Sequence, residues 1–258
     1  MLKEHEVIAK KITSFFEVGN RNPYKVVSPN FDGQGVSWGP HQHNLGQGTL
    51  QPVLREIKEK FPTVWYGCLP CLKDECVIDY VLECSKSKAV EYVQENWHNG
   101  CKLKPEWITF FECLGESAEA RSILDKHSAW ISKKAFELSN WMSSGNNTIR
   151  SYALAYDIVT QNGGIGKGLR LALTAARPFL NVYKSILLRR RKYDDTIWYQ
   201  VVAISRAAQS RVLGQKKYFL DVLSRKLLIV DGAAEFRGSW VDLEKKFGLS
   251  NKPIGDKK

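Results

Sequence analysis

Two acidic residues near the N-terminus, Glu17 and Asp32, could place a pair of carboxyl groups around one bond. Glu17 stands in the segment Phe-Phe-Glu-Val-Gly-Asn, and Asp32 opens the glycine-rich run Asp-Gly-Gln-Gly-Val-Ser. A carboxylic acid and a carboxylate that face each other across a groove are the groups that hydrolyse a glycosidic bond. We therefore take Glu17 as the candidate general acid, Asp32 as the candidate general base and Ser37 as the candidate holder of the attacking water.

A helix must position Glu17. Apolar residues recur before it at helical spacing and predict one buried face: Ile8, Ile12, Phe15 and Phe16. Gly19 and Asn20 are helix-stop residues, and Pro23 forbids continuation. Glu17 is then expected in the last turn, near the negative end of the helix and beside an aromatic pair, where the protonated carboxyl group is favoured. The alternative interpretation is an ordinary solvated glutamate.

The segment that carries Asp32 and Ser37 reads as short strands joined by tight turns, with turn signals at residues 29–30 and 32–33. Val36 and Trp38 alternate with Ser37, so Ser37 is expected to point away from their face. The run Gly-Gln-Gly-Val-Ser-Trp-Gly matches neither a P-loop nor a dinucleotide-binding fingerprint, which argues against a phosphate-binding loop.

The order Phe-Glu-x-Gly, then Asp-Gly-x-Gly-Val-Ser-x-Gly, resembles the catalytic core of the family 46 chitosanases, which are members of the lysozyme superfamily. The resemblance implies an α+β, mostly α, lysozyme-like two-lobed fold with a small β-sheet at the cleft, an inverting mechanism and no cofactor or metal. It assigns the acid, base and water-orienting roles to Glu17, Asp32 and Ser37. The chain departs from the family pattern with Ser37 where threonine is usual and Gln34 where arginine is typical.

The next segment, Pro-His-Gln-His-Asn-Leu-Gly at residues 40–46, departs from the chitosanase pattern and is closer to cell-wall lysins of phages and bacteria. Around it we name the candidate substrate-binding residues Tyr24, Gln34, Trp38, His41, Gln42, His43 and Asn44. His41 and His43 would face the same side of a strand, so a metal pair is a weaker alternative to sugar-binding or plain turn residues.

The net charge of +11 is concentrated in one region. Residues 165–226 hold fourteen Lys and Arg against three Asp, so the remainder of the chain is neutral. Such a basic region favours a polyanionic partner: nucleic acid, teichoic acid, anionic lipid or peptidoglycan with its free carboxylates. A solvated face without a partner is the alternative.

Six cysteines lie between residues 68 and 113: Cys68, Cys71, Cys76, Cys84, Cys101 and Cys113. They allow three interpretations, namely free buried thiols, up to three disulfides, or a zinc site that joins Cys68 and Cys71 to His98 and Cys101. The segment looks like an insertion in a single catalytic domain, 1–258. We expect a catalytic helix and β-region over 1–62, the cysteine-rich helical insertion over 63–114 and a helical, basic lobe over 115–258.

Asp157 stands on an apolar helix expected over residues 148–161, in a run similar to the Tyr-Asp-x-x-x-Gln-His-Gly helix end of the chitosanase family. A carboxylate there should be buried and paired. Arg206 and Arg225 on two later predicted helices are the available partners, and the ion pair is interpreted as structural.

Peptidoglycan is the expected substrate, with chitosan as the alternative, because a chain of net charge +11 repels polycationic chitosan. A nucleic-acid-binding module would explain the charge but not Glu17 or the glycine-rich turn, so nucleic acid is not the expected partner. The sequence has no signal peptide and no apolar stretch long enough to span a membrane. We therefore expect action on the cell wall after phage lysis, from a virion or through a secretion system, and otherwise a cytoplasmic location.

Overall fold

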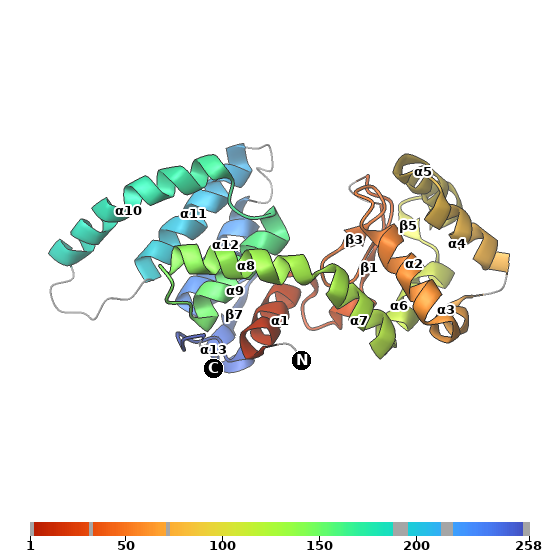
Figure 1. Ribbon diagram of the computed structural model, residues 1–258, viewed down its shortest axis with the longest axis horizontal. Coiled ribbons are helices and arrows are strands. Elements are labelled where there is room, and N and C mark those ends of the chain that lie inside the picture. The colour runs from red at the N-terminus through yellow and green to blue at the C-terminus, as the bar shows by residue number, and fades with distance from the viewer. Residues whose placement is uncertain (1–2, 31–32, 71–72, 188–195, 213–218, 255–258) are drawn as a thin grey trace. The chain divides into compact units, whose positions relative to one another are not determined.

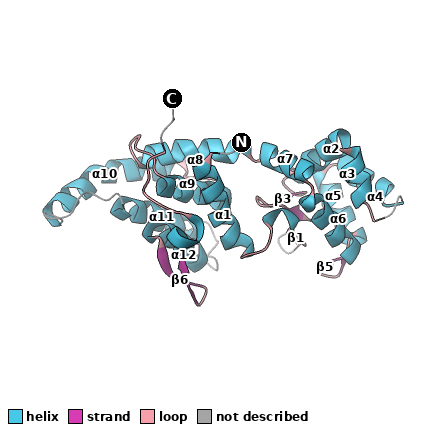
Figure 2. Ribbon diagram, turned by 90° about the horizontal axis from the view of Figure 1, so that it is seen from below, coloured by secondary structure: helices cyan, strands magenta, loops and turns pink. Residues whose placement is uncertain are grey.

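The computed structural model describes residues 3–30, 33–70, 73–187, 196–212 and 219–254. The chain forms two compact units: unit 1 comprises Met1–Phe16 and Trp130–Lys258, and unit 2 comprises Glu17–Ala129. The boundaries expected from composition, after residues 62 and 114, both fall inside unit 2. The two divisions differ because side chains from residues 36–57 pack in one core with those of the cysteine-rich segment. Helices dominate both units, as Figure 2 shows.

Unit 1 is built around α9, Ile149–Asn162, in which every residue from Ile149 to Val159 is buried. Its first turn is fixed by a capping box between Thr148 and Ser151. It ends at Gly163, whose φ of 69° is the left-handed conformation that glycine adopts without steric cost. Because apolar residues surround the whole circumference of its first three turns, α9 serves as the central helix of this core.

The other elements of unit 1 surround α9, and Figure 1 shows their order along the chain. They are α1 (Glu4–Val18), whose last two residues lie beyond the boundary with unit 2, α8 (Ala129–Met142), α10 (Lys167–Leu187), α11 (Thr196–Val212), α12 (Phe219–Asp231), the hairpin β6 (Ala233–Phe236) and β7 (Ser239–Asp242), and α13 (Leu243–Phe247). Helices α11 and α12 pack on each other and on α9. The first helix contributes the apolar face predicted from its spacing, with Ile8, Ile12 and Phe16 buried.

The sequence over residues 117–142 predicts a long helix or a broken pair of helices. The broken pair is confirmed, because α7 (Ala118–His127) ends at Ser128 before α8 begins. The sequence also predicts a short final helix over residues 240–247. This prediction is wrong in its first half, since residues 239–242 form β7 and pair with β6, and α13 begins at Leu243. Gly232 and Gly238 adopt positive φ around this hairpin, and these two glycines are a turn signal that the helix prediction did not use.

Unit 2 carries a small antiparallel sheet in the order β1-β2-β3, formed by Val27–Ser28, Ser37–Trp38 and His43–Asn44. Around it lie the short helix η1 (Pro23–Lys25), α2 (Leu50–Lys60), α3 (Pro62–Cys68), α4 (Lys73–Glu83), α5 (Lys86–Asn96), the hairpin β4 (His98–Asn99) and β5 (Lys102–Leu103), α6 (Pro105–Glu116) and α7. The apolar spacing of the sequence predicts helices over residues 49–61, 74–84 and 105–114, and these correspond to α2, α4 and α6. The sequence predicts Pro62 as the end of the first of them. Pro62 also begins α3, because proline suits a first helical position.

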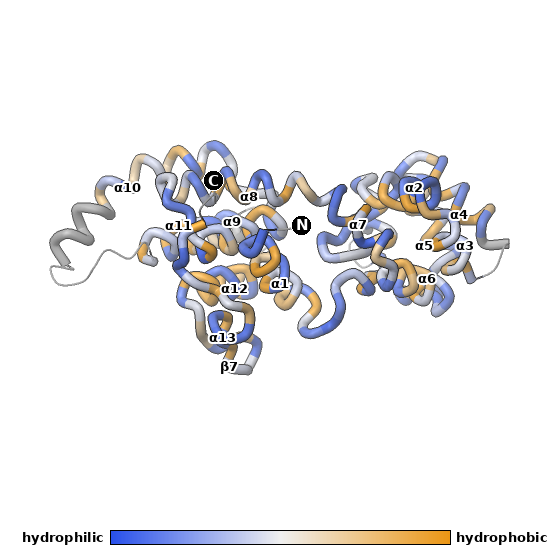
Figure 3. Tube along the Cα trace, turned by 60° about the horizontal axis from the view of Figure 1, so that its bottom comes forward, coloured by the Kyte–Doolittle hydropathy of each residue, from blue (hydrophilic) through white to orange (hydrophobic). Residues whose placement is uncertain are grey.

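Aromatic side chains fill the core of unit 2. Trp97 stacks on Trp107 with ring centroids 4.0 Å apart, and Trp65 meets Phe110 edge-on at 5.3 Å. Each unit has its own apolar core, and Figure 3 shows hydrophobic segments of chain in both units. Among the described residues, no helix is long and apolar enough to cross a membrane.

Candidate functional site

Glu17 lies in the last turn of α1 and its side chain is exposed. The residue before it, Phe16, is fully buried and meets Phe236 edge-on at 5.2 Å, with the Arg225 guanidinium 5.0 Å from its ring centroid. Arg237 donates a hydrogen bond of 3.1 Å to the Phe16 carbonyl. The buried Phe16 ring and the hydrogen bond to its carbonyl therefore hold the backbone next to Glu17 in place. A catalytic carboxyl group has to be positioned in this way by the residues around it.

Ser37 occupies the central strand, opposite Ser28 on one side and Asn44 on the other. Val36 and Trp38 both lie in the core of unit 2, and Ser37 between them is also buried. Trp38 is fully buried and packs against Phe111 at 5.4 Å. The Trp38 ring fills the interior of unit 2, and its predicted contact with a substrate stays a prediction.

The predicted strand through His41 and His43 is interrupted by a turn. Gln42 has a φ of 51°, and its backbone N–H donates to the Gly39 carbonyl at 3.1 Å. His41 and Gln42 thus lie in the turn, and only His43 enters β3. Gln42 also donates its side-chain amide to the Gly39 carbonyl at 3.0 Å, so part of its hydrogen-bonding capacity holds the turn together.

His43 and Asn44 are both buried, and their predicted contact with a substrate stays a prediction. The His43 Nε2 lies 3.0 Å from the Ser128 hydroxyl. Burial, with a smaller contribution from nearby His127, lowers the pKa of His43 to about 4, so the imidazole is neutral at pH 7. Asn44 accepts a hydrogen bond from the Gln47 N–H at 2.8 Å and so closes the turn before α2.

Tyr24 is half-buried and its hydroxyl donates to the Asp125 carboxylate at 3.0 Å. Burial and this carboxylate raise the pKa of Tyr24, and the Arg121 guanidinium lies 5.6 Å from the ring centroid. The residue therefore joins η1 to α7 within unit 2. Its predicted contact with a substrate stays a prediction.

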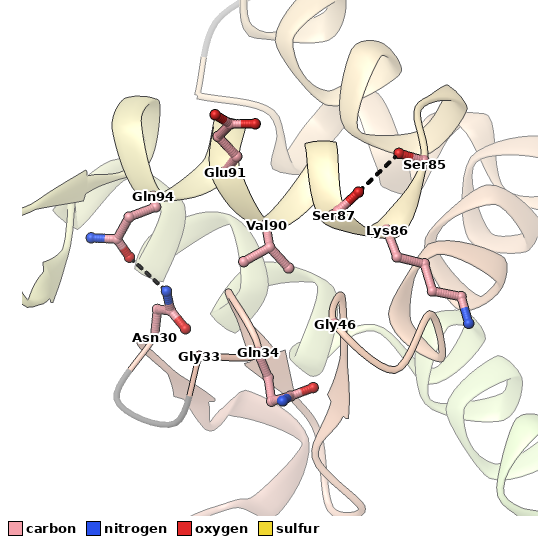
Figure 4. Close-up of a pocket in the computed structure, with 10 residues that line it drawn as sticks. All are labelled: Asn30, Gly33, Gln34, Gly46, Ser85, Lys86, Ser87, Val90, Glu91 and Gln94. Atoms are coloured by element: carbon pink, nitrogen blue, oxygen red, sulfur yellow. Dashed lines mark hydrogen bonds between the residues drawn. The ribbon is translucent and has the colours of Figure 1, made fainter.

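An open groove of about 800 Å³ lies in unit 2 between the loops around residues 30–46 and helix α5. Figure 4 shows Val90 pointing from α5 toward these loops, whereas Glu91 points away from them. Asp32, the candidate base, lies outside the described residues, but its chain neighbours Asn30 and Gly33 line the groove, as does Gln34. The remaining lining residues are Gly46, Ser85, Lys86, Ser87, Val90, Glu91 and Gln94.

Hydrogen bonds fix the rim of this groove. The Asn30 amide donates to Gln94 at 2.8 Å, and its oxygen accepts from the Gly35 N–H at 2.8 Å. The Asn30 N–H donates to Nε2 of His98 at 3.2 Å, while Nδ1 of His98 lies 3.0 Å from the Val93 carbonyl. The two partners require a proton on Nδ1 and a free electron pair on Nε2. His98 thus connects the loop at Asn30 to α5 by one hydrogen bond to each.

The groove presents hydrogen-bonding groups around an aliphatic floor. Amides from Asn30, Gln34 and Gln94 and hydroxyls from two serines surround Val90, with one cation from Lys86 and one anion from Glu91. Lys86 donates to the Gln47 carbonyl at 3.1 Å, which ties α5 to the loop after β3. Such a surface suits a polyhydroxylated ligand, which needs many donors and acceptors.

The cysteines divide between a disulfide and free thiols. Cys68 and Cys113 form a disulfide that links α3 to α6, while Cys76, Cys84 and Cys101 are free and Cys71 lies outside the described residues. With Cys68 oxidised and His98 holding Asn30, the zinc interpretation is wrong. Within the described part of the chain, no group of three or more His, Cys, Asp or Glu could hold a metal ion.

Asp157 is completely buried in unit 1, as predicted, and pairs with Arg225 at 2.6 Å. Its second partner is Lys226 at 3.0 Å, a residue that the sequence analysis did not name. Burial alone would raise the pKa of Asp157, but the two cations hold it below its usual range. Arg206, the other predicted partner, donates to the carbonyls of Asn162 and Gly164 at the end of α9.

The groove residues of α5 were missed by sequence reasoning. Residues 86–96 carried only a helical pattern, and nothing in their types pointed to a ligand. Asn30 and Gln94 are 64 positions apart in the chain, so their contact is a tertiary one that local patterns do not encode. Only the polar character of both segments, Asn-Phe-Asp-Gly-Gln and Ser-Lys-Ser, was available as a signal.

No family model matches the sequence, and no curated protein has a significantly similar sequence. Solved structures do match. A Gynuella sunshinyii family 46 chitosanase in complex with chitotetraose has a TM-score of 0.61 at 14% identity, covering 93% of this chain and 98% of that chain. Native chitosanase from Bacillus subtilis MY002 has a TM-score of 0.56 at 18% identity, covering 98% and 96%. A mutant of that chitosanase complexed with 6 GlcN matches similarly, with a TM-score of 0.56 at 17% identity and the same coverage. The predicted resemblance and the mostly helical α+β fold class are therefore confirmed.

Proposed function

On the fold of the family 46 chitosanases, we propose that this protein is an inverting glycoside hydrolase that cleaves β-1,4 bonds of bacterial peptidoglycan. In this proposal Glu17 protonates the leaving-group oxygen, Asp32 takes a proton from water, and Ser37 holds that water. One observation carries the proposal: the chain that shares this fold also has an exposed glutamate at the end of its first long helix, and Gly33 and Gln34, which follow Asp32 in the sequence, line a polar groove.

The inverting mechanism requires a water molecule between the base and the sugar, and hence roughly 6.5–9.5 Å between the two carboxyl groups. The rigidity of α1 at Phe16 supports the acid role of Glu17, because a general acid must be held within hydrogen-bond reach of its target. A helix terminus anchored by a buried aromatic residue loses little precision to thermal motion.

The charge distribution favours peptidoglycan over chitosan. Chitosan is a polycation in the acidic solutions that dissolve it, and a site for it would gain from several acidic residues. Among the described residues that line the groove, Glu91 is the one acid and Lys86 is a cation, while the candidate base Asp32 lies outside the described residues. Peptidoglycan carries lactyl-linked peptides with free carboxylates, and the chain's charge of +11 attracts such a polymer at long range. Anionic cell-wall polymers such as teichoic acids would be attracted in the same way.

The mechanism is tested by Glu17→Gln, which keeps the shape of the side chain and removes the acidic proton. Turnover should fall by ~10²-fold or more while the melting temperature stays unchanged. Glu4→Gln, at the other exposed end of the same helix, is the matched control and should retain full turnover. Asp32→Asn should behave as Glu17→Gln does, and Ser37→Ala should lose less. Full activity of Glu17→Gln would refute the assignment.

A chitosanase is the second candidate, favoured by two similar structures that are complexes with chitotetraose and with 6 GlcN. The two candidates are distinguished by the rate at which the protein releases reducing ends. The rate is measured on purified peptidoglycan and on soluble chitosan at equal mass. The peptidoglycan reading requires the faster rate on peptidoglycan and a loss of rate as salt rises toward ~0.5 M, where the charge attraction is screened. A faster rate on chitosan would show that chitosan is the substrate, and the proposed roles of Glu17, Asp32 and Ser37 would remain the same.

A further inference from the structure

Helix α10 leaves one apolar face uncovered. It lies at the edge of unit 1 beside α11 (Figure 1), with Leu173 buried on its inner side. On the opposite side, Leu171 is 62% and Phe179 is 77% exposed. Three small residues between or next to them are also exposed, at the spacing of one helical face: Gly168, Ala172 and Ala175. An apolar stripe of this kind on the outside of a folded unit indicates a surface that binds a membrane or another protein.

The edge of this face is basic. Lys167 and Arg170 are exposed beside it, and Arg170 lies 5.1 Å from the Trp141 ring centroid. Arg177 serves the fold instead, because it donates to the Met142 carbonyl at 2.9 Å at the end of α8. Neither Asp nor Glu occurs from residue 158 to residue 193 of the sequence. The basic run 189–192 falls in that stretch but outside the described residues.

We propose that the exposed face of α10 binds the surface of a membrane that contains anionic lipids. A helix with an apolar stripe and a basic edge inserts its stripe at the boundary between headgroups and acyl chains, while its cations meet lipid phosphates. Leu171 and Phe179 supply the insertion, and Lys167 and Arg170 supply the charge. This inference is independent of the glycosidase proposal, since it uses no residue of the groove.

Two other occupants fit this face less well. A polyanion such as nucleic acid would engage the cations but leave Leu171 and Phe179 in water. A second copy of the chain would bring together two helices that both lack acidic residues, and like charges across an interface oppose association. The exposed Leu220 and Trp240 elsewhere in unit 1 differ, because each adjoins an acid: Leu220 precedes Asp221, and Trp240 pairs with Glu235 across the hairpin.

The test is sedimentation of the full chain with vesicles of phosphatidylcholine alone or of phosphatidylcholine and phosphatidylglycerol in equal parts. The wild-type chain should sediment with the anionic vesicles only. Leu171→Asn/Phe179→Asn should bind them at least ~10-fold more weakly, because two large apolar side chains no longer enter the bilayer. Leu220→Asn/Trp240→Asn, which removes equally exposed apolar side chains elsewhere in unit 1, should bind as the wild type does. Circular dichroism checks that each variant is folded, and alanine replaces asparagine where it is not.

A second pair of measurements separates the contribution of charge. Lys167→Gln/Arg170→Gln should weaken binding to anionic vesicles severalfold, and salt near ~0.5 M should reduce wild-type binding by a similar factor. Three outcomes would overturn the proposal: no sedimentation with anionic vesicles, equal sedimentation of Leu171→Asn/Phe179→Asn and the wild type, or a wild-type dimer in solution that this variant dissociates. Wild-type binding to an oligonucleotide that is stronger than binding to anionic vesicles would also overturn it, in favour of a nucleic-acid surface.

Discussion

Replacing Asp157 by asparagine should destabilise unit 1 strongly without touching the proposed chemistry. The side chain is 0% exposed and its two partners, Arg225 and Lys226, are 2% and 0% exposed. Asparagine keeps the volume, so no cavity forms, but it leaves two buried cations without their anion. Breaking a buried ion pair on one side costs roughly 3–5 kcal/mol.

Two features of the structure place the expected cost in the lower part of that range, at about 3 kcal/mol. Lys226 keeps a second acceptor, the Gln161 side-chain oxygen at 2.6 Å. Burial already lowers the pKa of Lys226, so in the variant the ammonium can release its proton rather than stay charged and unpaired. The folded variant then binds fewer protons than its unfolded chain, and its stability rises with pH. The difference in the free energy of unfolding between Asp157→Asn and the wild type should therefore become smaller from pH 7 to pH 9.

Urea denaturation followed by circular dichroism measures this effect, with separate transitions fitted if the two units unfold independently. Asp221→Asn is the matched control, because Asp221 pairs with Arg237 at 2.7 Å in the same unit but is 34% exposed. An exposed pair should cost less than ~1 kcal/mol. A cost for Asp157→Asn equal to that of the control, or a gap that widens as pH rises, would refute the reasoning.

Two further predictions concern unit 2. Because burial lowers the pKa of His43 to about 4 from 6.5, its unfolded form binds more protons between these values, and stability should fall by up to about 3 kcal/mol as pH drops from 6.5 to 4. His43→Gln should flatten this part of the stability profile in urea titrations, and an unchanged slope would contradict the assignment. Gly115→Ala should cost about 1–3 kcal/mol, because a Cβ there would lie 2.2 Å from the Tyr24 carbonyl oxygen. Gly67→Ala, where nothing lies within 4 Å, should be neutral or slightly stabilising, so equal melting temperatures for the two variants would count against the packing argument.

Local patterns in the sequence determined the helices and the backbone of the candidate acid. The apolar spacing before Glu17 and the stop residues after it predicted the end of α1, and the observed helix ends at Val18. The same reasoning predicted α9 and the burial of Asp157, because a carboxylate on an apolar helix should be buried and paired. These features depend on residues within a few turns of each other.

Contacts between distant residues decided the rest. The groove exists because Asn30 reaches Gln94 and His98, and no periodicity links residues so far apart. His43 and Trp38 resembled ligand contacts in the sequence, yet the register that pairs them across β2 and β3 directs both into the core. Side-chain type alone does not distinguish a polar residue that meets a ligand from one that closes a turn. That choice depends on which segments the fold brings together, and only the tertiary structure contains that information.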